Sequence, residues 1–192
     1  MSFELRPEQQ RTVDWMVGRE GDDPGARGGI LADDVGAGKT FAVVGLMRQS
    51  PLWPALVVVP KSLVWQWIRT LQMGGLTDVC AVTSRSAAAA ERSLSCEGVV
   101  LVTLGVMVSA SDPPAALADR AWGRVVVDEA HCAKNPRSRT NRVLRSLIAH
   151  ARWAVTADPV QNHEGDLLAI ARVVGVEADG DVALARSFVR YR

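Results

Sequence analysis

The sequence of 192 residues is poor in lysine and cysteine and has no long apolar run. Its formal net charge is only +1, so any site for nucleic acid must be a local patch rather than an overall basic excess. No apolar run reaches the roughly 18 residues of a membrane span, and the acidic N-terminal segment is unlike a signal peptide. We therefore expect an intracellular protein with no membrane partner.

The three cysteines, Cys80, Cys96 and Cys132, are an odd number and share no metal-like spacing. We therefore expect small buried or half-buried thiols in a reducing compartment, and no structural metal. Lysine is also scarce, because the chain has nineteen arginines and only three lysines. A chain that prefers arginine has kept Lys39, which indicates that a compact point charge is needed there.

Strand and helix patterns alternate along the chain. Continuous apolar, β-branched runs predict strands covered on both faces, at 29–32, 55–60, 78–82, 99–103, 124–128 and 153–156. The segments between them predict helices at 5–17, 39–48, 87–94, 141–150 and 166–174, and one that Ser62 caps and Gly74-Gly75 ends. Together they predict one domain, residues 1–192, with an α/β fold: a doubly wound, mostly parallel sheet with helices on both faces.

A glycine-rich turn follows the first of these strands and opens a helix. The segment DDVGAGKT fits the second half of a Walker A pattern with Gly36, Gly38, Lys39 and Thr40. Asp33 stands at the first glycine position of that pattern. Glycines let backbone N–H groups approach phosphate oxygens, and a helix N-terminus favours negative charge. We predict that Lys39 neutralises the β and γ phosphates of a nucleotide and that the Thr40 hydroxyl binds Mg²⁺.

The run VVVDEAH places two adjacent carboxylates, Asp128 and Glu129, at the end of a buried strand about ninety residues later. Ligands of open α/β sheets bind at the carboxyl ends of the strands. We predict that Asp128 holds Mg²⁺ and that Glu129 orients or deprotonates the attacking water, with His131 as a coupling residue rather than a base. An Asp-Glu pair alone is often a solvated strand end, but a preceding phosphate loop makes the joint signal strong.

With both motifs placed, the chain resembles the first motor lobe of the Swi/Snf-related ATPases of helicase superfamily two, a RecA-like P-loop domain. Segments similar to family motifs lie at 5–16, 28–40, 57–70, 99–107, 122–136 and 152–162. The DEAH box is followed by the Lys-Asn-Pro signature of that family. The resemblance implies a helicase-like ATPase that uses ATP and Mg²⁺ and moves along DNA.

The resemblance also assigns roles to individual side chains. Nucleotide binding is assigned to Arg6, to the adenine-reading Gln9, and to Asp33, Asp34, Val35, Gly36, Ala37, Gly38, Lys39 and Thr40. Catalysis is assigned to Lys39, Asp128, Glu129 and Gln161, and Mg²⁺ to Thr40 and Asp128. Coupling of ATP to DNA is assigned to His131, Thr156 and Asp158. Lys61 and Thr103 are expected to contact the phosphate backbone of duplex DNA without reading its sequence.

Two departures from the family pattern affect the expected chemistry. Glu8 replaces the aromatic residue that usually precedes Gln9, so we expect weak adenine stacking and loose nucleotide choice. The third motif usually reads Thr-Gly-Thr-Pro, and here Asp158 stands at its third position. Two interpretations stay open: Asp158 lies near Asp128 and Glu129 and weakens hydrolysis by like-charge repulsion, or it points outward.

Motors of this family need a second RecA-like lobe, in cis or in trans, and we expect none after Val160. An arginine finger from that lobe is worth about 10³–10⁵ in rate, so the chain alone should bind Mg-ATP weakly and hydrolyse it slowly or not at all. One alternative is a non-hydrolysing ATP- or DNA-binding remnant that acts as a regulator or scaffold. Another is a motor subunit of a restriction or viral transcription complex, although the Lys-Asn-Pro signature argues against restriction enzymes.

We expect such a motor in the nucleus or another DNA-containing compartment of a eukaryote, or in the cytoplasm if its source is prokaryotic or viral. A second basic patch, Arg137, Arg139, Arg142 and Arg145, is either a further DNA contact or a solvated helix face. Trp67 lies on the apolar face of its helix and is expected in the core. For neighbouring Trp65, stacking on a base stays open.

Overall fold

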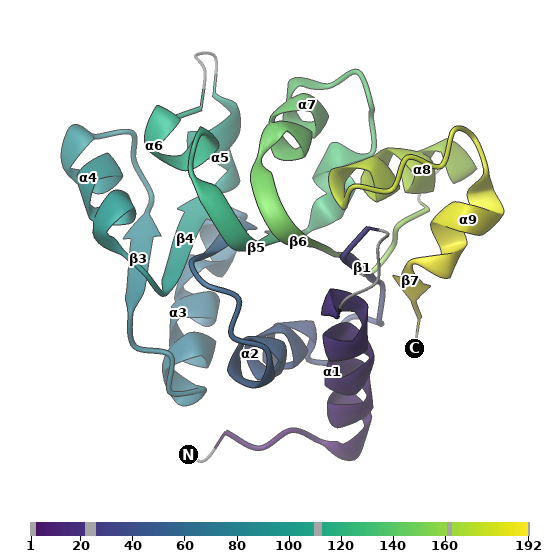
Figure 1. Cartoon of the computed structure of the whole chain (residues 1–192), viewed down its shortest axis with the longest axis horizontal. Helices are drawn as coiled ribbons and strands as arrows, with labels where there is room; N and C mark the ends of the chain where they lie inside the picture. Colours follow the sequence, from purple (N-terminus) through teal and green to yellow (C-terminus); the bar gives the residue numbers. More distant parts are fainter. Residues whose placement is uncertain (1–2, 22–25, 110–112, 161–162, 192) are drawn as a thin grey trace.

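One parallel sheet of seven strands forms the centre of the computed structural model, which describes residues 3–21, 26–109, 113–160 and 163–191 (Figure 1). The strand order is β3-β4-β2-β5-β6-β1-β7, and the described pairs are all parallel. The strands are β1 (Gly28–Leu31), β2 (Ala55–Val59), β3 (Val79–Val82), β4 (Val99–Thr103), β5 (Ala121–Asp128), β6 (Ile148–Val155) and β7 (Val189–Arg190). This doubly wound α/β sheet confirms the predicted fold class.

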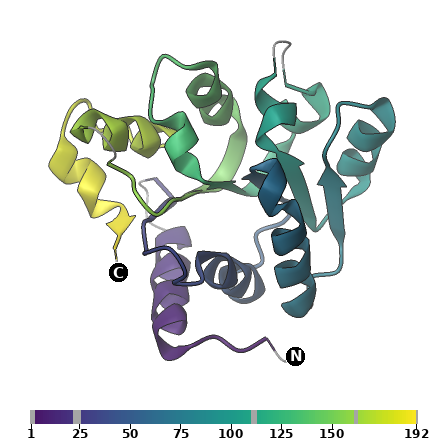
Figure 2. The same ribbon diagram turned by 180° about the vertical axis from the view of Figure 1, so that it is seen from behind.

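Helices cover both faces of the sheet (Figures 1 and 2). One layer, here the α1–α3 layer, contains α1 (Pro7–Glu20), α2 (Lys39–Gln49) and α3 (Val64–Met73). The opposite layer contains α4 (Ala87–Ser95), α5 (Leu104–Val108), α6 (Ala115–Ala118), α7 (Arg139–Ser146), α8 (Glu164–Val173) and α9 (Val182–Ser187). Short 3₁₀ turns, η1 (Lys61–Leu63) and η2 (Ala130–Ala133), follow β2 and β5. Among the described helices, none is both long and apolar enough to cross a bilayer.

The side chains of strand β2 pack alternately against the two helix layers. Ala55, Val57 and Val59 face the α1–α3 layer, whereas Leu56 and Val58 face the opposite layer. The split arises because successive side chains of a strand point to opposite faces. All five residues are buried, which is why this strand reads as a continuous apolar run.

The predicted ends of several elements were wrong, and the two largest differences concern α7 and α3. Helix α7 ends at Ser146, and residues 148–150, expected to be helical, begin β6. Ile148 pairs with Ala121 of β5, so sheet pairing prevails over the helical pattern there. Ser62 does not cap α3, because η1 intervenes and Leu63 occupies the N-cap position without a side-chain bond.

The cysteine side chains are free thiols in buried or half-buried positions, as expected. Burial is the largest effect on all three and raises the pKa of Cys96 and of Cys132 to about 11. Their thiols are therefore protonated at neutral pH and are poor nucleophiles.

A buried polar network joins the end of α1 to the middle of β5. Arg124 is fully buried, and its Nε donates to Glu20 Oε1 over 2.6 Å. Glu20 also accepts hydrogen bonds from Trp153 Nε1 on β6 (2.8 Å) and from Ser50 Oγ after α2 (2.7 Å). The network thus fixes the ends of two helices against two central strands.

We expect Glu20→Gln to destabilise the fold by about 3–5 kcal/mol, because it leaves the Arg124 guanidinium buried without its counter-charge. The matched control is Glu164→Gln, which removes an exposed pair with Arg186 (3.0 Å) and should cost at most about 1 kcal/mol. Urea unfolding of both variants measures the difference. Equal losses of stability would contradict the role given to the buried pair.

Candidate functional site

The carboxyl ends of β1, β5 and β6 meet around one pocket of about 330 Å³. The residues that line it and that the sequence predicted are Val35, Gly36, Gly38, Lys39, Thr40, Asp128 and Glu129. Four lining residues were not predicted: Phe41, Leu63, Gln66 and Ala157. Because β6 alone separates β1 from β5, the glycine loop and the DEAH box lie at one site.

The loop conformation depends on two glycines. Gly36 and Gly38 both have φ of +83°, in the left-handed region that L side chains disfavour. Gly38 is the N-cap residue of α2, so the free N–H groups of the first helical turn lie at the pocket. Lys39 Nζ donates to the carbonyl oxygens of Asp33 (2.6 Å) and Asp34 (3.0 Å). Phosphate oxygens would give Lys39 charged acceptors in place of these carbonyls.

Arg6 and Gln9 hold the loop from the start of α1. Arg6 Nη2 and Gln9 Nε2 both donate to the Ala37 carbonyl oxygen, over 2.8 and 3.2 Å. Gln9 Oε1 accepts the Arg6 backbone N–H at 2.9 Å, and Gln9 is only 6% exposed. Both ends of the Gln9 amide are therefore engaged, and the reading of adenine by Gln9 stays a prediction.

An aromatic surface borders the pocket at a place that the sequence did not suggest. Phe41 follows the loop directly, and its ring stacks on Phe3 with centroids 5.5 Å apart and planes 11° apart. Glu8, which stands where an aromatic residue is usual, lies 3.6 Å from Arg6 Nε. The motif position thus carries an ion pair, and the aromatic side chains come from elsewhere in the chain.

Asp128 ends β5 and is 8% exposed. Burial raises the pKa of Asp128, while the hydrogen bonds that it accepts oppose that rise. Trp67 Nε1 donates to its Oδ2 over 2.7 Å, and the Glu129 backbone N–H donates to its Oδ1 over 2.9 Å. Both bonds favour the ionised carboxylate, which is the form that binds a metal ion.

The oxygens at this site suit Mg²⁺. Thr40 and Asp128 line the same pocket with a hydroxyl and a carboxylate, which are the hard ligands that Mg²⁺ prefers. Mg²⁺ usually takes few protein ligands and completes its shell with water and nucleotide phosphates. Two protein oxygens beside a phosphate loop therefore fit this ion.

Glu129 adopts an uncommon conformation, with φ of +51°. Left-handed residues other than glycine concentrate at functional sites. The Glu129 carboxylate lies 3.1 Å from His131 Nδ1. The residue predicted to act on water is thus in direct contact with a residue predicted to couple ATP to DNA.

The third motif lies beside the pocket, and Asp158 is not among the residues that line it. Asp158 is exposed, and its Oδ1 accepts the Val160 backbone N–H at 3.1 Å. The Thr156 hydroxyl accepts the Asp158 backbone N–H at 3.3 Å. Among the described residues of this turn, Ala157 lines the pocket and Asp158 does not, which supports the outward interpretation. Gln161 lies outside the described residues, so its catalytic role stays a prediction.

The two predicted DNA contacts differ in exposure. Lys61 is exposed at the start of η1, whereas Thr103 is 4% exposed at the end of β4 and offers little surface to a phosphate. Trp67 is fully buried, as predicted, and Trp65 is 80% exposed. Both DNA assignments stay predictions, with Lys61 the better placed.

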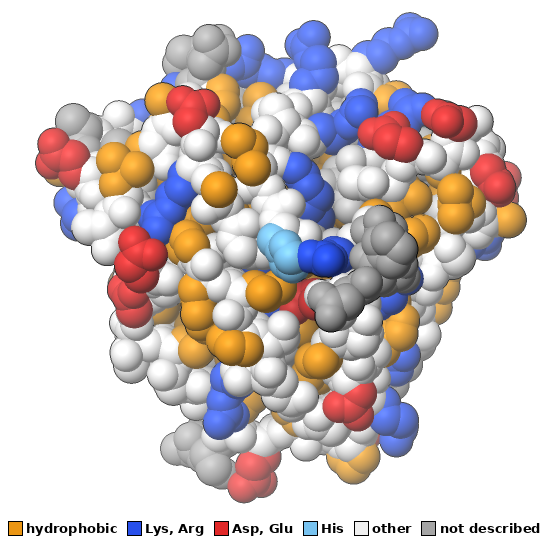
Figure 3. Space-filling model, in the orientation of Figure 1, with side chains coloured by type: hydrophobic (Ala, Val, Ile, Leu, Met, Phe, Trp, Pro, Cys, Tyr) orange, Lys and Arg blue, Asp and Glu red, His pale blue; other side chains and the backbone are white. Residues whose placement is uncertain are grey.

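The second basic patch lies on and just before α7. Figure 3 shows Lys and Arg side chains along the border that α7 occupies in Figure 1. Arg137 and Arg142 are exposed, while Arg145 pairs with Glu177 at 3.1 Å. The geometry fits a solvated helix face as well as a DNA contact.

Comparison with known proteins decides the family. A family model of the SNF2-related domain matches residues 8–184. The chain belongs to the SNF2-related family. This confirms the resemblance that the motifs indicated.

Relatives of this SNF2-related chain are much longer than it is. The ISWI chromatin-remodeling complex ATPase ISW1 of Saccharomyces cerevisiae is 30% identical over 179 residues, covering 87% of this chain and 15% of the relative. The DNA repair and recombination protein RAD54-like of Gallus gallus is 30% identical over 211 residues, covering 100% of this chain and 28% of the relative. The chain therefore spans less than a third of the length of these two proteins.

A solved structure shares the fold. The Sulfolobus solfataricus SWI2/SNF2 ATPase core in complex with dsDNA superposes with a TM-score of 0.80 at 23% identity. The match covers 98% of this chain and 44% of that chain. It confirms the RecA-like architecture.

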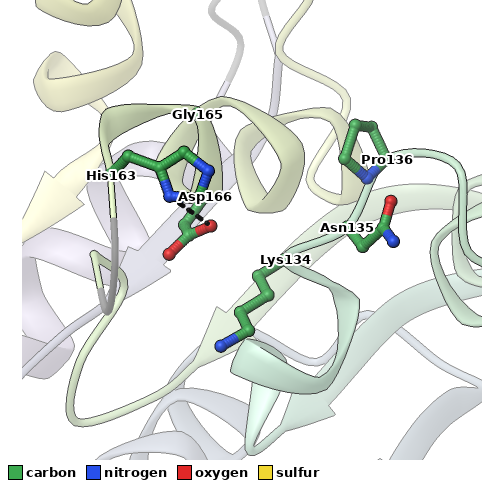
Figure 4. A pocket seen from close by; sticks show the side chains of 6 residues that line it. All are labelled: Lys134, Asn135, Pro136, His163, Gly165 and Asp166. Atoms are coloured by element: carbon green, nitrogen blue, oxygen red, sulfur yellow. Dashed lines mark ion pairs between the residues drawn. The ribbon is translucent and has the colours of Figure 1, made fainter.

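A second hollow, of about 400 Å³, lies beside the Lys-Asn-Pro signature of this SNF2-related chain. Figure 4 shows its lining residues, Lys134, Asn135, Pro136, His163, Gly165 and Asp166. His163 Nδ1 lies 3.7 Å from Asp166 Oδ1, and Asp166 is 4% exposed. The signature therefore lies against the first turn of α8, and none of these six residues lines the pocket at the glycine loop.

Two glycine variants test the loop geometry. A Cβ at Gly38 would approach Gln9 Nε2 to 2.2 Å, whereas a Cβ at Gly36 would meet nothing within 4 Å. Gly36→Ala should lower the free energy of unfolding by about 1 kcal/mol, because alanine disfavours the left-handed φ of this position. Gly38→Ala should cost about 2 kcal/mol or more, because it also displaces the Gln9 amide from the Ala37 carbonyl.

Urea unfolding without nucleotide measures these costs, and a double-mutant cycle tests their cause. Gln9→Ala combined with Gly38→Ala should destabilise by about 1 kcal/mol less than the sum of the single changes. Strict additivity would show that Gly38 and Gln9 are not in contact.

Proposed function

We propose that residues 1–192 form the ATP-binding first lobe of a Swi/Snf-type DNA-dependent ATPase. Hydrolysis by this lobe would be coupled to movement along duplex DNA once a second RecA-like lobe, in cis or in trans, completes the site. The observation that carries the proposal is the meeting of Lys39, Thr40, Asp128 and Glu129 at one pocket. These are the groups that cradle a triphosphate, hold its metal ion and act on water.

Each side chain has a physical reason for its proposed role. Lys39 would leave the Asp33 and Asp34 carbonyls for the β and γ phosphates, where it meets full negative charge. Thr40 and Asp128 would hold Mg²⁺, which neutralises charge that develops on the phosphates. Glu129 would orient or deprotonate the attacking water, with its carboxylate held by His131.

Stacking of the base would fall to Phe41 rather than to the residue before Gln9. Phe41 lines the pocket and is backed by Phe3, while Glu8 offers no aromatic face. Stacking is tolerant of base identity because every base has a π-face. A preference for ATP over GTP should therefore be modest in this lobe.

Duplex DNA is the proposed partner at the exposed Lys61. One relative in the family is named for DNA repair and recombination, and the superposed core is described in complex with dsDNA. Lys61 lies on η1, the turn that leads into α3 and whose Leu63 lines the nucleotide pocket. DNA bound at Lys61 would therefore lie one helical turn from the nucleotide.

A non-hydrolysing ATP- or DNA-binding module is the second candidate. The observation on its side is that the match covers 44% of the superposed core, so any groups that a second lobe would bring to the nucleotide lie outside this match. The exposure of Asp158 and its bond to the Val160 backbone N–H weaken one argument for this candidate, since Asp158 is not among the residues that line the pocket.

ATP turnover separates the two candidates. The 192-residue chain alone should hydrolyse ATP slowly, because an arginine finger from a second lobe is worth about 10³–10⁵ in rate. Addition of a second-lobe polypeptide should restore DNA-stimulated turnover, and Glu129→Gln should abolish it while Mg-ATP still binds. Fast, DNA-stimulated hydrolysis by the isolated chain would contradict the need for a second lobe. Background turnover with the added lobe, even after Asp158→Thr, would favour the binding module.

Lys61→Ala should weaken binding of duplex DNA equally across sequences and reduce the salt slope of log K by about 0.9, as expected for one lost phosphate contact. Arg11→Ala is the matched control, since it removes one exposed positive charge from α1 and should leave the slope unchanged. Binding titrations at several salt concentrations measure both. An unaltered slope for Lys61→Ala would show that Lys61 does not contact the backbone.

A further inference from the structure

Trp67 is buried in the α1–α3 layer, and its side chain is hydrogen-bonded to Asp128, which lines the proposed nucleotide pocket. It lies in the first turns of α3 and is fully buried. Its indole N–H donates to Asp128 Oδ2 over 2.7 Å, and Asp128 itself is 8% exposed. Hydrogen bonds between a buried donor and a carboxylate are short and strong because water cannot compete for either partner.

The two oxygens of the Asp128 carboxylate are held by different parts of the fold. Oδ2 accepts from Trp67 on α3, and Oδ1 accepts the backbone N–H of Glu129 at the start of η2. Rotation of the carboxylate would break at least one of these bonds. The plane of the carboxylate is therefore fixed before any ligand arrives, which is what an ordered metal site requires.

Apolar packing alone does not explain an indole at this position. The neighbours of Trp67 in the α1–α3 layer include the aliphatic Val64 and Leu71, and a phenylalanine would fill such a layer without needing a hydrogen-bond acceptor. The buried Trp122 bonds the Leu117 carbonyl oxygen (3.0 Å), and Trp153 bonds Glu20 (2.8 Å) in the structural network. Among these three buried tryptophans, Trp67 alone donates to a side chain that lines the pocket.

Helix α3, which carries Trp67, also borders the pocket and directly follows η1, the turn that carries the proposed DNA contact Lys61. Leu63, the N-cap residue of α3, and Gln66, in its first turn, line the same pocket as Asp128. Lys61 begins η1 directly before that turn. A displacement of η1 by a bound phosphate backbone would therefore move the donor that fixes Asp128.

We propose that Trp67 is a positioning residue for the Mg²⁺ carboxylate: its indole N–H orients Asp128 and links that carboxylate to the DNA-facing η1–α3 segment. The inference rests on the proposed function, because it takes Asp128 as a Mg²⁺ ligand. It predicts that loss of the indole N–H weakens the Mg²⁺-dependent part of nucleotide binding and leaves the metal-free part unchanged.

Binding of a fluorescent ATP analogue, measured with Mg²⁺ and with EDTA, tests this prediction in the 192-residue chain. Trp67→Phe should reduce the affinity gain that Mg²⁺ provides by about tenfold or more, as the loss of other groups that orient metal ligands does. Its affinity in EDTA should equal that of the unaltered chain. Trp122→Phe, the matched control, removes an equally buried indole bonded to a backbone oxygen and should keep the full gain.

Equal Mg²⁺ gains in Trp67→Phe and Trp122→Phe would overturn the proposal. Benzothienylalanine at position 67 controls for packing, because it keeps the two-ring shape and replaces the N–H by sulfur. It should reproduce the effect of phenylalanine, and a full Mg²⁺ gain in its presence would also overturn the proposal.

Failure of the proposed function has a different signature. If the unaltered chain gains no nucleotide affinity from Mg²⁺, the assignment of the site is wrong. The indole ¹H–¹⁵N signal of Trp67, identified by its loss in Trp67→Phe, then tests the bond by itself. Asp128→Asn should shift this signal more than the signals of the other five tryptophans, and an unmoved signal would exclude the contact.

Discussion

Strand β5 carries one charged side chain near its middle, Arg124, and one at its carboxyl end, Asp128, and both charges are buried against the α1–α3 layer. Arg124, Val126 and Asp128 follow one another at intervals of two, so they face the same side of the sheet. Arg124 is held by Glu20 of α1, and Asp128 by Trp67 of α3. An unpaired charge in this apolar layer would be strongly destabilising. The positions of α1 and α3 on the sheet are therefore fixed by buried hydrogen bonds as well as by apolar packing.

The same layer provides three kinds of support to the proposed nucleotide site. Side chains at the start of α1 hold the glycine loop at Ala37, α2 begins directly after that loop, and Trp67 of α3 bonds the Asp128 carboxylate. The strand order β5-β6-β1 sets the distance between the loop and the carboxylates. A shift of the α1–α3 layer would consequently affect the proposed phosphate loop, the proposed metal ligands and the segment that carries Lys61 together.

The parts of the fold that rest on local pattern could be predicted from the sequence. The loop from Asp33 to Thr40 and the Asp128–Glu129 pair could be predicted because each is a run of consecutive residues of characteristic type directly after an apolar strand. The Trp67–Asp128 bond joins residues 61 apart, and the Arg6–Ala37 bond residues 31 apart, so neither leaves a local signal. The α7–β6 boundary was misplaced for a related reason, since Ile148 is extended by its pairing with β5 rather than by its own neighbours.

A crystal structure of the chain with Mg²⁺ and a non-hydrolysable ATP analogue tests the central claim most directly. We predict that Lys39 Nζ exchanges the Asp33 and Asp34 carbonyls for the β and γ phosphates, that Thr40 and Asp128 share the metal ion, and that Trp67 keeps its bond to Asp128. A triphosphate bound elsewhere, or Lys39 still bonded to the two carbonyls beside a bound nucleotide, would contradict it.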